Sequence, residues 1–442
     1  MRAVVIGGGV AGLVAARRLA VGGADVVLLE ASDRLGGRVA AAEVGGIVVD
    51  GGAESFAVRG GAVLALVQRL GLGADVVGPA GSAWVALADR TVPLPAGGLL
   101  GIPSSPLATD VRRVVDTRGS VRAYADRLLP LLKVGRYERL GPLVRGRMGD
   151  RVLERLVAPV VQNVYGADPD QVPVDAVAPG LNSAMTTAGT LSGAVLRLRA
   201  AAPPGSAAQT VVGGVHRVVE ALVAEVAALG VDVRLGTPAI GVHPAPDDGP
   251  ITVVTAREDL EAGRVVLAAD GAAALGLLGD AAPDVARLPL PVPAASTAVL
   301  LRVDDRRLDA APRGTGVLRA AGRDDVRATA LTHATAKWPW LAERAGPGSH
   351  VLRLAYRGTE AVPDATVLAD AAALLGIGRI DAVARADVRW SDSAPPLAPE
   401  TRAIRAALAR TRLPEGLALA GSWVAGTGLA SVVAGAERAA RL

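Results

Sequence analysis

Three glycines near the start of the chain have the spacing of a dinucleotide-binding turn. They form Gly7-x-Gly9-x-x-Gly12, between an apolar run at residues 3–6 and a helical pattern at residues 13–20. The first glycine permits a tight turn, and the second lets a pyrophosphate approach the backbone. The third lets the helix pack closely against the strand. The N-terminus of that helix would offer N–H donors and a positive dipole end to the phosphates.

An acidic residue follows at the position where such sites hold a ribose. Glu30 lies 23 residues after Gly7, at the end of a second apolar run over residues 25–29. A carboxylate at the end of this strand can accept hydrogen bonds from both ribose hydroxyls. The glycine motif with this acid predicts a dinucleotide cofactor, but it leaves FAD and NAD both open.

The elements that position these residues are predicted to come from separate parts of the chain. Strand patterns return at residues 231–235 and 264–269, and residues 417–442 again suggest a strand, a turn and a helix. Residues 105–200 instead place apolar residues at helical spacing, and we expect helix breaks at Pro130, Pro142 and Pro159. Beyond residue 283, short alternating runs indicate a mixed sheet.

Composition excludes several kinds of chemistry. The 442 residues include no cysteine and four histidines, so disulfides, thiolate metal sites, a cysteine nucleophile and a cysteine-bonded cofactor are excluded, and we expect no metal site. All but two of the 47 basic residues are arginine, yet the net charge is only +4. This charge excess is too small to indicate a nucleic-acid partner.

One uncharged stretch is long enough to be tested as a membrane span. Residues 416–436 carry no charge, but they include five glycines together with Ser422, Thr427 and Ser431. A strand, a glycine-rich turn and a buried helix explain this composition better than a transmembrane helix does. We therefore expect a cytoplasmic protein without a signal peptide, whose membrane contact is at most peripheral.

Several further blocks carry a family resemblance. Residues 34–38 read Arg-Leu-Gly-Gly-Arg, and residues 50–55 read Asp-Gly-Gly-Ala-Glu-Ser. Toward the C-terminus, residues 421–423 read Gly-Ser-Trp. With these blocks the sequence resembles the FAD-dependent amine oxidase and protoporphyrinogen oxidase superfamily. Residues 158–169 and the Lys-Trp-Pro at residues 337–339 are most similar to its oxygen-dependent porphyrinogen oxidase branch. Within that branch, the alanine-, glycine- and arginine-rich composition looks most like the Gram-positive and actinobacterial coproporphyrinogen III oxidases.

The resemblance implies an α/β fold in three parts. A discontinuous Rossmann-like FAD-binding domain would comprise residues 1–78, 207–273 and 400–442. A mixed-sheet substrate domain would comprise residues 79–104 and 274–399, and an inserted α-helical domain residues 105–206. Non-covalently bound FAD is the implied cofactor. Its predicted contacts are Gly7, Gly9, Val10, Ala11, Gly12, Glu30, Arg34, Gly36, Gly37, Arg38, Gly51, Gly52, Ala53, Gly421, Ser422, Trp423, Gly428 and Leu429.

The implied reaction is oxidation of coproporphyrinogen III to coproporphyrin III in haem biosynthesis, with oxygen as acceptor and hydrogen peroxide as by-product. A downstream ferrochelatase is a possible partner. No catalytic side chain is predicted, because the flavin carries the chemistry. Arginine suits carboxylates, and the candidates for substrate binding are Arg59, Asn163, Tyr165 and Lys337.

Three alternatives stay open at this point. The substrate could be protoporphyrinogen IX, with two propionates in place of four. The chain could be a flavin amine oxidase, although its ten aromatic residues offer little for an aromatic cage around an amine. It could also be an FAD-bound scaffold without catalytic activity.

Overall fold

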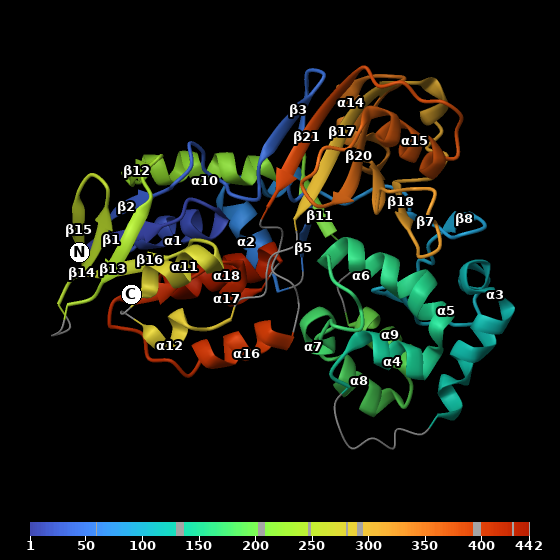
Figure 1. Cartoon of the computed structure of the whole chain (residues 1–442), viewed down its shortest axis with the longest axis horizontal. Coiled ribbons are helices and arrows are strands. Elements are labelled where there is room, and N and C mark those ends of the chain that lie inside the picture. The colour runs from blue at the N-terminus through green and yellow to red at the C-terminus, as the bar shows by residue number, and fades with distance from the viewer. Residues whose placement is uncertain are drawn as a thin grey trace.

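The computed structural model describes residues 1–58, 60–129, 137–201, 208–245, 249–279, 282–289, 295–391, 399–426 and 428–441. Figure 1 shows three regions: a sheet flanked by helices at the N-terminal end, a second sheet at upper right, and a group of helices below it. The predicted α/β class with a parallel-sheet unit, a mixed sheet and a helical insertion is confirmed.

Five parallel strands from three separate segments of the chain form the first sheet. Four of the five residues in each of the neighbouring inner strands β1 and β2 are buried, as expected for a parallel sheet covered on both faces. The strand order is β12 (Asp232–Arg234), β2 (Asp25–Leu29), β1 (Arg2–Ile6), β16 (Arg264–Leu267) and β22 (Leu417–Leu419).

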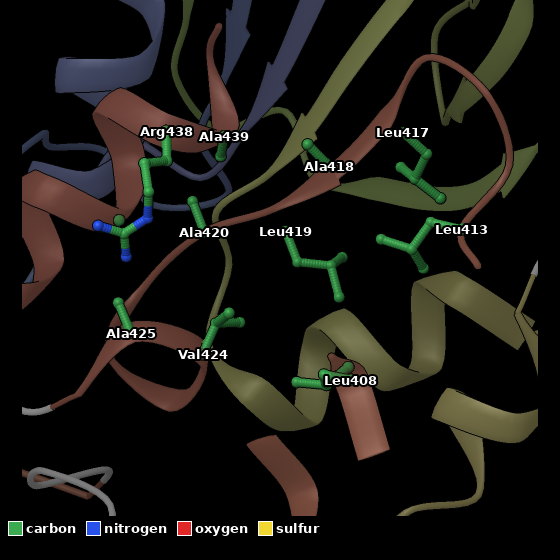
Figure 2. Close-up of a pocket in the computed structure, with 11 residues that line it drawn as sticks. Leu408, Leu413, Leu417, Ala418, Leu419, Ala420, Val424, Ala425, Arg438 and Ala439 are labelled. Carbon is green, nitrogen blue, oxygen red and sulfur yellow. The ribbon is translucent and has the colours of Figure 1, made fainter. Parts of the chain in front are cut away.

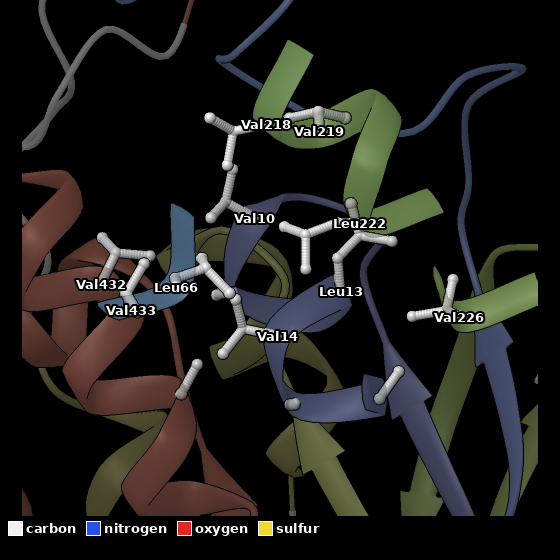
Figure 3. Packing of buried hydrophobic residues seen from close by; sticks show 14 of the residues in the cluster. Val10, Leu13, Val14, Leu66, Val218, Val219, Leu222, Val226, Val432 and Val433 are labelled. Atoms are coloured by element: carbon white, nitrogen blue, oxygen red, sulfur yellow. The ribbon is translucent and has the colours of Figure 1, made fainter. Parts of the chain in front are cut away.

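Helices cover one face of this sheet and a mixed layer covers the other. Figure 3 shows the first layer, where Leu13, Leu66, Leu222 and Val433 meet in one apolar core. It consists of α1 (Val10–Val21), α2 (Ala62–Arg69), α10 (His216–Ala228) and α18 (Leu429–Ala439). The opposite core includes α11 (Gly271–Leu278), α12 (Pro283–Ala286), and the three strands β13 (Ala239–His243), β14 (Ile251–Thr255) and β15 (Asp259–Ala262).

The second sheet is mixed and has seven strands. Only β18 and β7 pair in parallel among its described strand pairs. Helix α15 (Asp364–Leu375) contributes to the apolar core on one face. The order is β21 (Ala384–Trp390), β17 (Ser296–Asp304), β20 (Ser349–Arg357), β19 (Ala330–His333), β18 (Gly316–Arg319), β7 (Trp84–Ala86) and β8 (Thr91–Pro93).

The other face of the seven-stranded sheet packs against a hairpin from the N-terminal segment. Strands β3 (Ala41–Val44) and β4 (Ile47–Asp50) share an apolar core with α13 (Ala334–Lys337) and α14 (Pro339–Ala345). The hairpin therefore links the two sheets. Three short strands form a further sheet, β5 (Phe56–Ala57), β11 (Ala208–Val211) and β6 (Val76–Val77), and two form a small pair, β9 (Gly98–Leu99) and β10 (Ile102–Pro103).

The helical region has an apolar core of its own. The expected helix breaks at Pro142 and Pro159 are wrong, and Pro130 lies outside the described residues. Pro142 lies in the first turn of α4, where the missing N–H would have no partner in any case. Pro159 lies inside a continuous helical run, directly after a π-helical turn that interrupts the regular hydrogen-bond pattern. The helices are α3 (Thr109–Tyr124), α4 (Leu140–Met148), α5 (Asp150–Val152), a π-helical turn (Leu153–Val157), α6 (Ala158–Tyr165), α7 (Val174–Val177), α8 (Leu181–Ala188) and α9 (Leu191–Ala200).

The uncharged C-terminal stretch contains β22, α17 (Ser422–Ala425) and most of α18, as the strand, turn and helix interpretation predicted. Within the described ranges, none of the helices is both long and apolar enough to span a membrane. The predicted domain boundaries stay predictions. Helices α11 and α12, which lie around and beyond residue 273, pack on the five-stranded sheet.

Candidate functional site

Two glycines of the N-terminal turn are fixed by protein packing. Gly7 follows β1 with a φ of +106°, and a Cβ there would lie 2.8 Å from the carbonyl oxygen of Ala268. A Cβ on Gly12 would lie 1.8 Å from the carbonyl oxygen of Gly7. Any side chain at Gly12 would therefore push α1 away from β1, so the sheet and helix themselves require these two glycines.

Gly9 has a different reason to lack a side chain. Its φ of −69° suits any residue, and a Cβ there would meet no described atom within 4 Å. The space above Gly9 is therefore open, and it lies at the N-terminus of α1, where the first backbone N–H groups have no partner within the helix. An open, donor-rich surface is what a pyrophosphate needs.

Glu30 is held in a defined orientation beside this turn. Its carboxylate accepts hydrogen bonds from the backbone N–H of Gly8 at 2.6 Å, and from the N–H and hydroxyl of Ser32 at 2.8 and 2.7 Å. These bonds place the acid at the carboxyl edge of the sheet, next to the open face above Gly9. A carboxylate so placed can accept bonds from ribose hydroxyls.

The predicted segment at residues 34–38 lies directly against the turn. The N–H of Gly36 donates to the carbonyl of Gly8 at 2.9 Å, and a Cβ on Gly37 would lie 3.3 Å from the Cα of Gly9. The exposed Arg34 donates to the carbonyl of Gly37 at 3.1 Å. The structure therefore brings two glycine-rich segments, distant in sequence, into one surface.

The segment at residues 51–53 continues this surface toward the second sheet. A Cβ on Gly52 would lie 1.9 Å from the carbonyl oxygen of Arg38 and 3.3 Å from the ring of Trp390. The N–H of Ala53 donates to the same carbonyl at 3.3 Å. Trp390, at the end of β21, also lies 5.9 Å from the guanidinium of Arg34. Sequence reasoning missed Trp390, because no motif spacing connects it to the turn.

Glu54 anchors this end of the site to the second sheet. Its carboxylate forms an ion pair with the ammonium of Lys337 and lies 4.0 Å from the guanidinium of Arg353. Arg353 also donates to the carbonyl of Gly52 at 2.8 Å. Burial would raise the pKa of Glu54, but the charges of Lys337 and Arg353 outweigh it and hold the pKa below its usual value.

The C-terminal block reaches the same edge of the five-stranded sheet. Gly421, with a φ of +111°, lies beyond β22, where a Cβ would be 3.6 Å from the carbonyl oxygen of Ala269. At the opposite edge, Arg264 donates to the carbonyl of Ala439 at 2.8 Å and holds the C-terminal end of α18. Helix α18 therefore begins at the same edge as α1. Its N-cap, Gly428, is as open as Gly9: a Cβ there would meet no described atom within 4 Å.

The predicted substrate-binding residues do not form one cluster. Asn163 of α6 donates its side-chain amide to the carbonyl of Pro159, within its own helix, at 2.7 Å. Tyr165 packs against the apolar core of the helical region. Arg59 lies outside the described residues. Lys337 is bonded to Glu54 beside the predicted FAD contacts.

A family model describes the sequence from residue 10 to residue 442, under the description flavin containing amine oxidoreductase. The chain belongs to this family. Its members are flavoproteins, and the frame built from Gly7 to Gly12 and Glu30 fits a dinucleotide. The prediction of FAD as the cofactor of this oxidoreductase is thus confirmed.

Individual relatives of this flavin-containing oxidoreductase cover between four fifths and nearly all of its length. A coproporphyrinogen III oxidase of Mycobacterium bovis is 31% identical, over 98% of this chain and 95% of its own. A protein of the same description from Propionibacterium freudenreichii is 30% identical, over 79% of this chain and 71% of its own.

Solved structures agree with this assignment. A protein from Exiguobacterium sp. 255-15, provisionally named a protoporphyrinogen oxidase, superposes with a TM-score of 0.82 at 25% identity, over 99% of this chain and 97% of its own. Cyclohexylamine oxidase from Brevibacterium oxydans superposes with a TM-score of 0.70 at 17% identity, over 99% of this chain and 97% of its own, and shows the shared fold.

Proposed function

We propose that this flavoprotein oxidises coproporphyrinogen III to coproporphyrin III in haem biosynthesis. The observation that carries the proposal is the near-complete, collinear match to bacterial proteins described as coproporphyrinogen III oxidases. The substrate loses six electrons and six protons in three steps. Three molecules of oxygen accept them and become three molecules of hydrogen peroxide.

FAD, when bound, would supply the redox chemistry between the substrate and oxygen. The side chains and backbone of this protein would bind and orient it. The open space at Gly9 and the first N–H groups of α1, at Val10 and Ala11, would receive the pyrophosphate, and Glu30 would receive the ribose. The surface formed by residues 34–38 and 51–53 extends from the turn toward Trp390 and the second sheet.

The substrate then lies where the FAD surface meets the seven-stranded sheet. Carboxylates of the macrocycle need cationic partners, and arginine provides two parallel hydrogen bonds for each of them. Lys337 is engaged with Glu54, so we assign it to positioning residues 51–54 beneath the flavin. Among the remaining candidates, Arg59, Asn163 and Tyr165, none is assigned a role in the chemical step.

The place of this reaction in the cell follows from its product. A coproporphyrin is a free-base macrocycle that is ready for metal insertion, so the enzyme that consumes it is a ferrochelatase. We propose that transfer of the product to this enzyme takes place in the cytoplasm.

Anaerobic mixing of the FAD-loaded protein with a porphyrinogen tests the function directly. We expect coproporphyrinogen III to bleach the flavin absorbance, and protoporphyrinogen IX to do so more slowly. Faster bleaching by protoporphyrinogen IX would assign the two-propionate substrate instead. If neither compound bleaches the flavin, the proposal fails. Bleaching by an amine alone would then identify an amine oxidase. A flavin that no electron donor bleaches would identify an FAD-bound scaffold without catalytic activity.

A further inference from the structure

Arg405, on α16 (Pro399–Leu408), is partly buried, and two of its three guanidinium nitrogens lack a hydrogen-bond partner among the described residues. Its Nε and Nη2 atoms are inaccessible to solvent and form no hydrogen bond within the part of the chain that the structure describes. Burial lowers the pKa of Arg405. A guanidinium removed from water is strongly destabilising unless an anion or an acceptor replaces the lost hydration. The fold therefore provides a cation whose partner is not one of the protein's described side chains.

The guanidinium of Arg405 is directed at the connection between α17 and α18. Its Nη2 lies 3.7 Å from the point where a Cβ on Gly426 would be, and the hydroxyl of Ser431 lies 3.4 Å from that point. Gly426 ends α17 and Ser431 belongs to the first turn of α18. Because α18 begins at the carboxyl edge of the five-stranded sheet, Arg405 faces the same edge as the FAD surface.

This corner contains further donors without acceptors. The indole N–H of Trp423 has no hydrogen-bond partner within the described ranges, although the residue is only 4% exposed. Among the described residues no side chain caps the N-terminus of α18. The N–H of Ser431 already bonds to the carbonyl of Gly428 at 2.9 Å, so the N–H groups before it and the positive dipole end are what the helix offers to a ligand. A group that satisfies this corner must accept hydrogen bonds and carry negative charge.

A neighbouring cavity does not supply such a group. It has a volume of about 350 Å³ and lies between α16, α18 and β22, with leucine and alanine side chains around it and Arg438 at one side (Figure 2). Its lining is apolar, and the Arg438 side chain is exposed. Among the described residues, the unpartnered donors of this corner belong to Arg405 and Trp423, and both lie near the edge of the sheet where the FAD surface is.

We propose that Arg405 binds the pyrimidine end of the flavin ring and stabilises the negative charge that this ring carries after reduction. The two uncapped helix N-termini, at Gly9 and Gly428, lie at one sheet edge and match the two electron-rich parts of FAD. The pyrophosphate occupies the first, and the carbonyl oxygens and N1 of the flavin occupy the second. Arg405 then acts as a positioning and electrostatic residue for the cofactor. This inference rests on FAD as the cofactor and not on the identity of the substrate.

Sulfite titration of the oxidised holoenzyme tests the proposal without substrate. The sulfur of sulfite forms a bond to N5 of the flavin, and the negative charge that results resides on the pyrimidine ring. We expect Arg405→Met to weaken this adduct by about tenfold or more, as loss of one close charge partner predicts. Arg405→Lys should recover part of the effect because it keeps the charge. If the methionine variant does not fold, Arg405→Gln should weaken the sulfite adduct in the same way.

Arg438→Met is the matched control, since it removes an exposed arginine of the neighbouring helix, and its sulfite affinity should equal that of the unmodified protein. An unchanged sulfite affinity in Arg405→Met with FAD still bound would overturn the proposal. If the KM for the porphyrinogen rose instead, Arg405 would be assigned to a substrate carboxylate. Flavin bleaching by coproporphyrinogen III is measured separately, so either proposal can fail while the other stands.

Discussion

Gly9 and Gly12 are three residues apart, yet the structure gives them different reasons for lacking a side chain. At Gly12 a Cβ would collide with the carbonyl of Gly7, whereas at Gly9 it would meet open space. Packing therefore requires glycine at position 12, and the space left for a ligand requires it at position 9. The two substitutions separate folding from cofactor binding.

Gly9→Val should abolish FAD binding and leave the apoprotein folded. The valine side chain fills the space of the pyrophosphate, while its effect on the free energy of unfolding should stay within about 1 kcal/mol. FAD retention after gel filtration and thermal unfolding of the apoprotein measure the two effects. Gly12→Val is the control, and it should lower stability sharply. A yellow Gly9→Val protein would show that the pyrophosphate binds elsewhere.

A buried histidine pair determines part of the acid stability. Nε2 of His350 lies 3.0 Å from Oδ1 of Asp309, and its Nδ1 lies 3.1 Å from Nε2 of His333. With the Asp309 carboxylate as acceptor, the neutral pair carries its protons on the two Nε2 atoms. Protonation of His333 would place a second N–H on Nδ1, which has no acceptor within the described ranges. Burial, together with the charge on His350, lowers the pKa of His333 from 6.5 to about 4.

Because the folded state resists protonation of His333, the unfolded state binds more protons between pH 6.5 and about 4. The free energy of unfolding is therefore highest above pH 6.5 and falls as the pH is lowered through this window. His333 alone should account for a loss of about 3 kcal/mol. Urea unfolding at several pH values should show a steeper acid loss for the unmodified protein than for His333→Gln. Equal slopes would contradict this assignment.

At the scale of elements, one buried ion pair joins three helical segments. Asp126 follows α3, and its carboxylate accepts from Nε of Arg147 on α4 at 2.5 Å and from the N–H of Leu191 at the start of α9 at 2.6 Å. Arg147 also donates to the carbonyl of Leu129 at 3.1 Å. Asp126 is fully buried and Arg147 is 3% exposed. These groups satisfy one another, so the pair fixes the helices relative to each other.

Asp126→Ala should destabilise the helical region by about 3–5 kcal/mol, because it leaves the Arg147 guanidinium buried without its carboxylate. Limited proteolysis should then cleave within residues 105–200 while FAD stays bound. Asp150→Ala provides the comparison. It removes an exposed ion pair with Arg145, which is worth about 1 kcal/mol or less. Equal protease resistance of the two variants would contradict the proposed role of the buried pair.

At the scale of the whole molecule, residues 41–54 connect the FAD surface to the seven-stranded sheet. Cations of the sheet region bind this segment at three points along its length. Arg302 donates to the carbonyl of Gly45 at 2.7 Å, Arg353 donates to that of Gly52 at 2.8 Å, and Lys337 pairs with Glu54. These contacts set the distance between the flavin surface and the sheet that faces the substrate.

Lys337→Met should loosen this connection at Glu54. Burial disfavours the charged form of Glu54, and in this variant only Arg353 would offset that effect. The pKa of Glu54 should therefore rise toward or above its usual value. We expect the affinity for FAD to fall by about tenfold, because the Glu54 segment loses one charge partner. Lys337→Arg should restore most of the affinity. Titration of the apoprotein with FAD measures the change. A loss of substrate affinity with unchanged FAD binding would instead favour the substrate-binding interpretation of Lys337.

The sequence predicted the parts of the site that depend on local backbone geometry. Gly7, Gly9, Gly12 and Glu30 occur in one continuous strand, turn, helix and strand, so their spacing defines their arrangement. Trp390 could not be predicted, because its position beside Gly52 depends on how β21 packs against the β3–β4 hairpin. No local pattern encodes such a contact between distant segments.

The sequence by itself determined the fold class, the dinucleotide frame and the flavin family, since these follow from short motifs and hydrophobic periodicity. Only the tertiary structure decided which charges are available to a ligand. It paired Lys337 with Glu54, turned the Asn163 amide back onto its own helix, and left two buried nitrogens of Arg405 without a partner among the described residues. The sequence does not show whether the charge of an arginine or a lysine is paired with another group or available to a ligand. The difference arises from burial and from neighbours that the fold brings together.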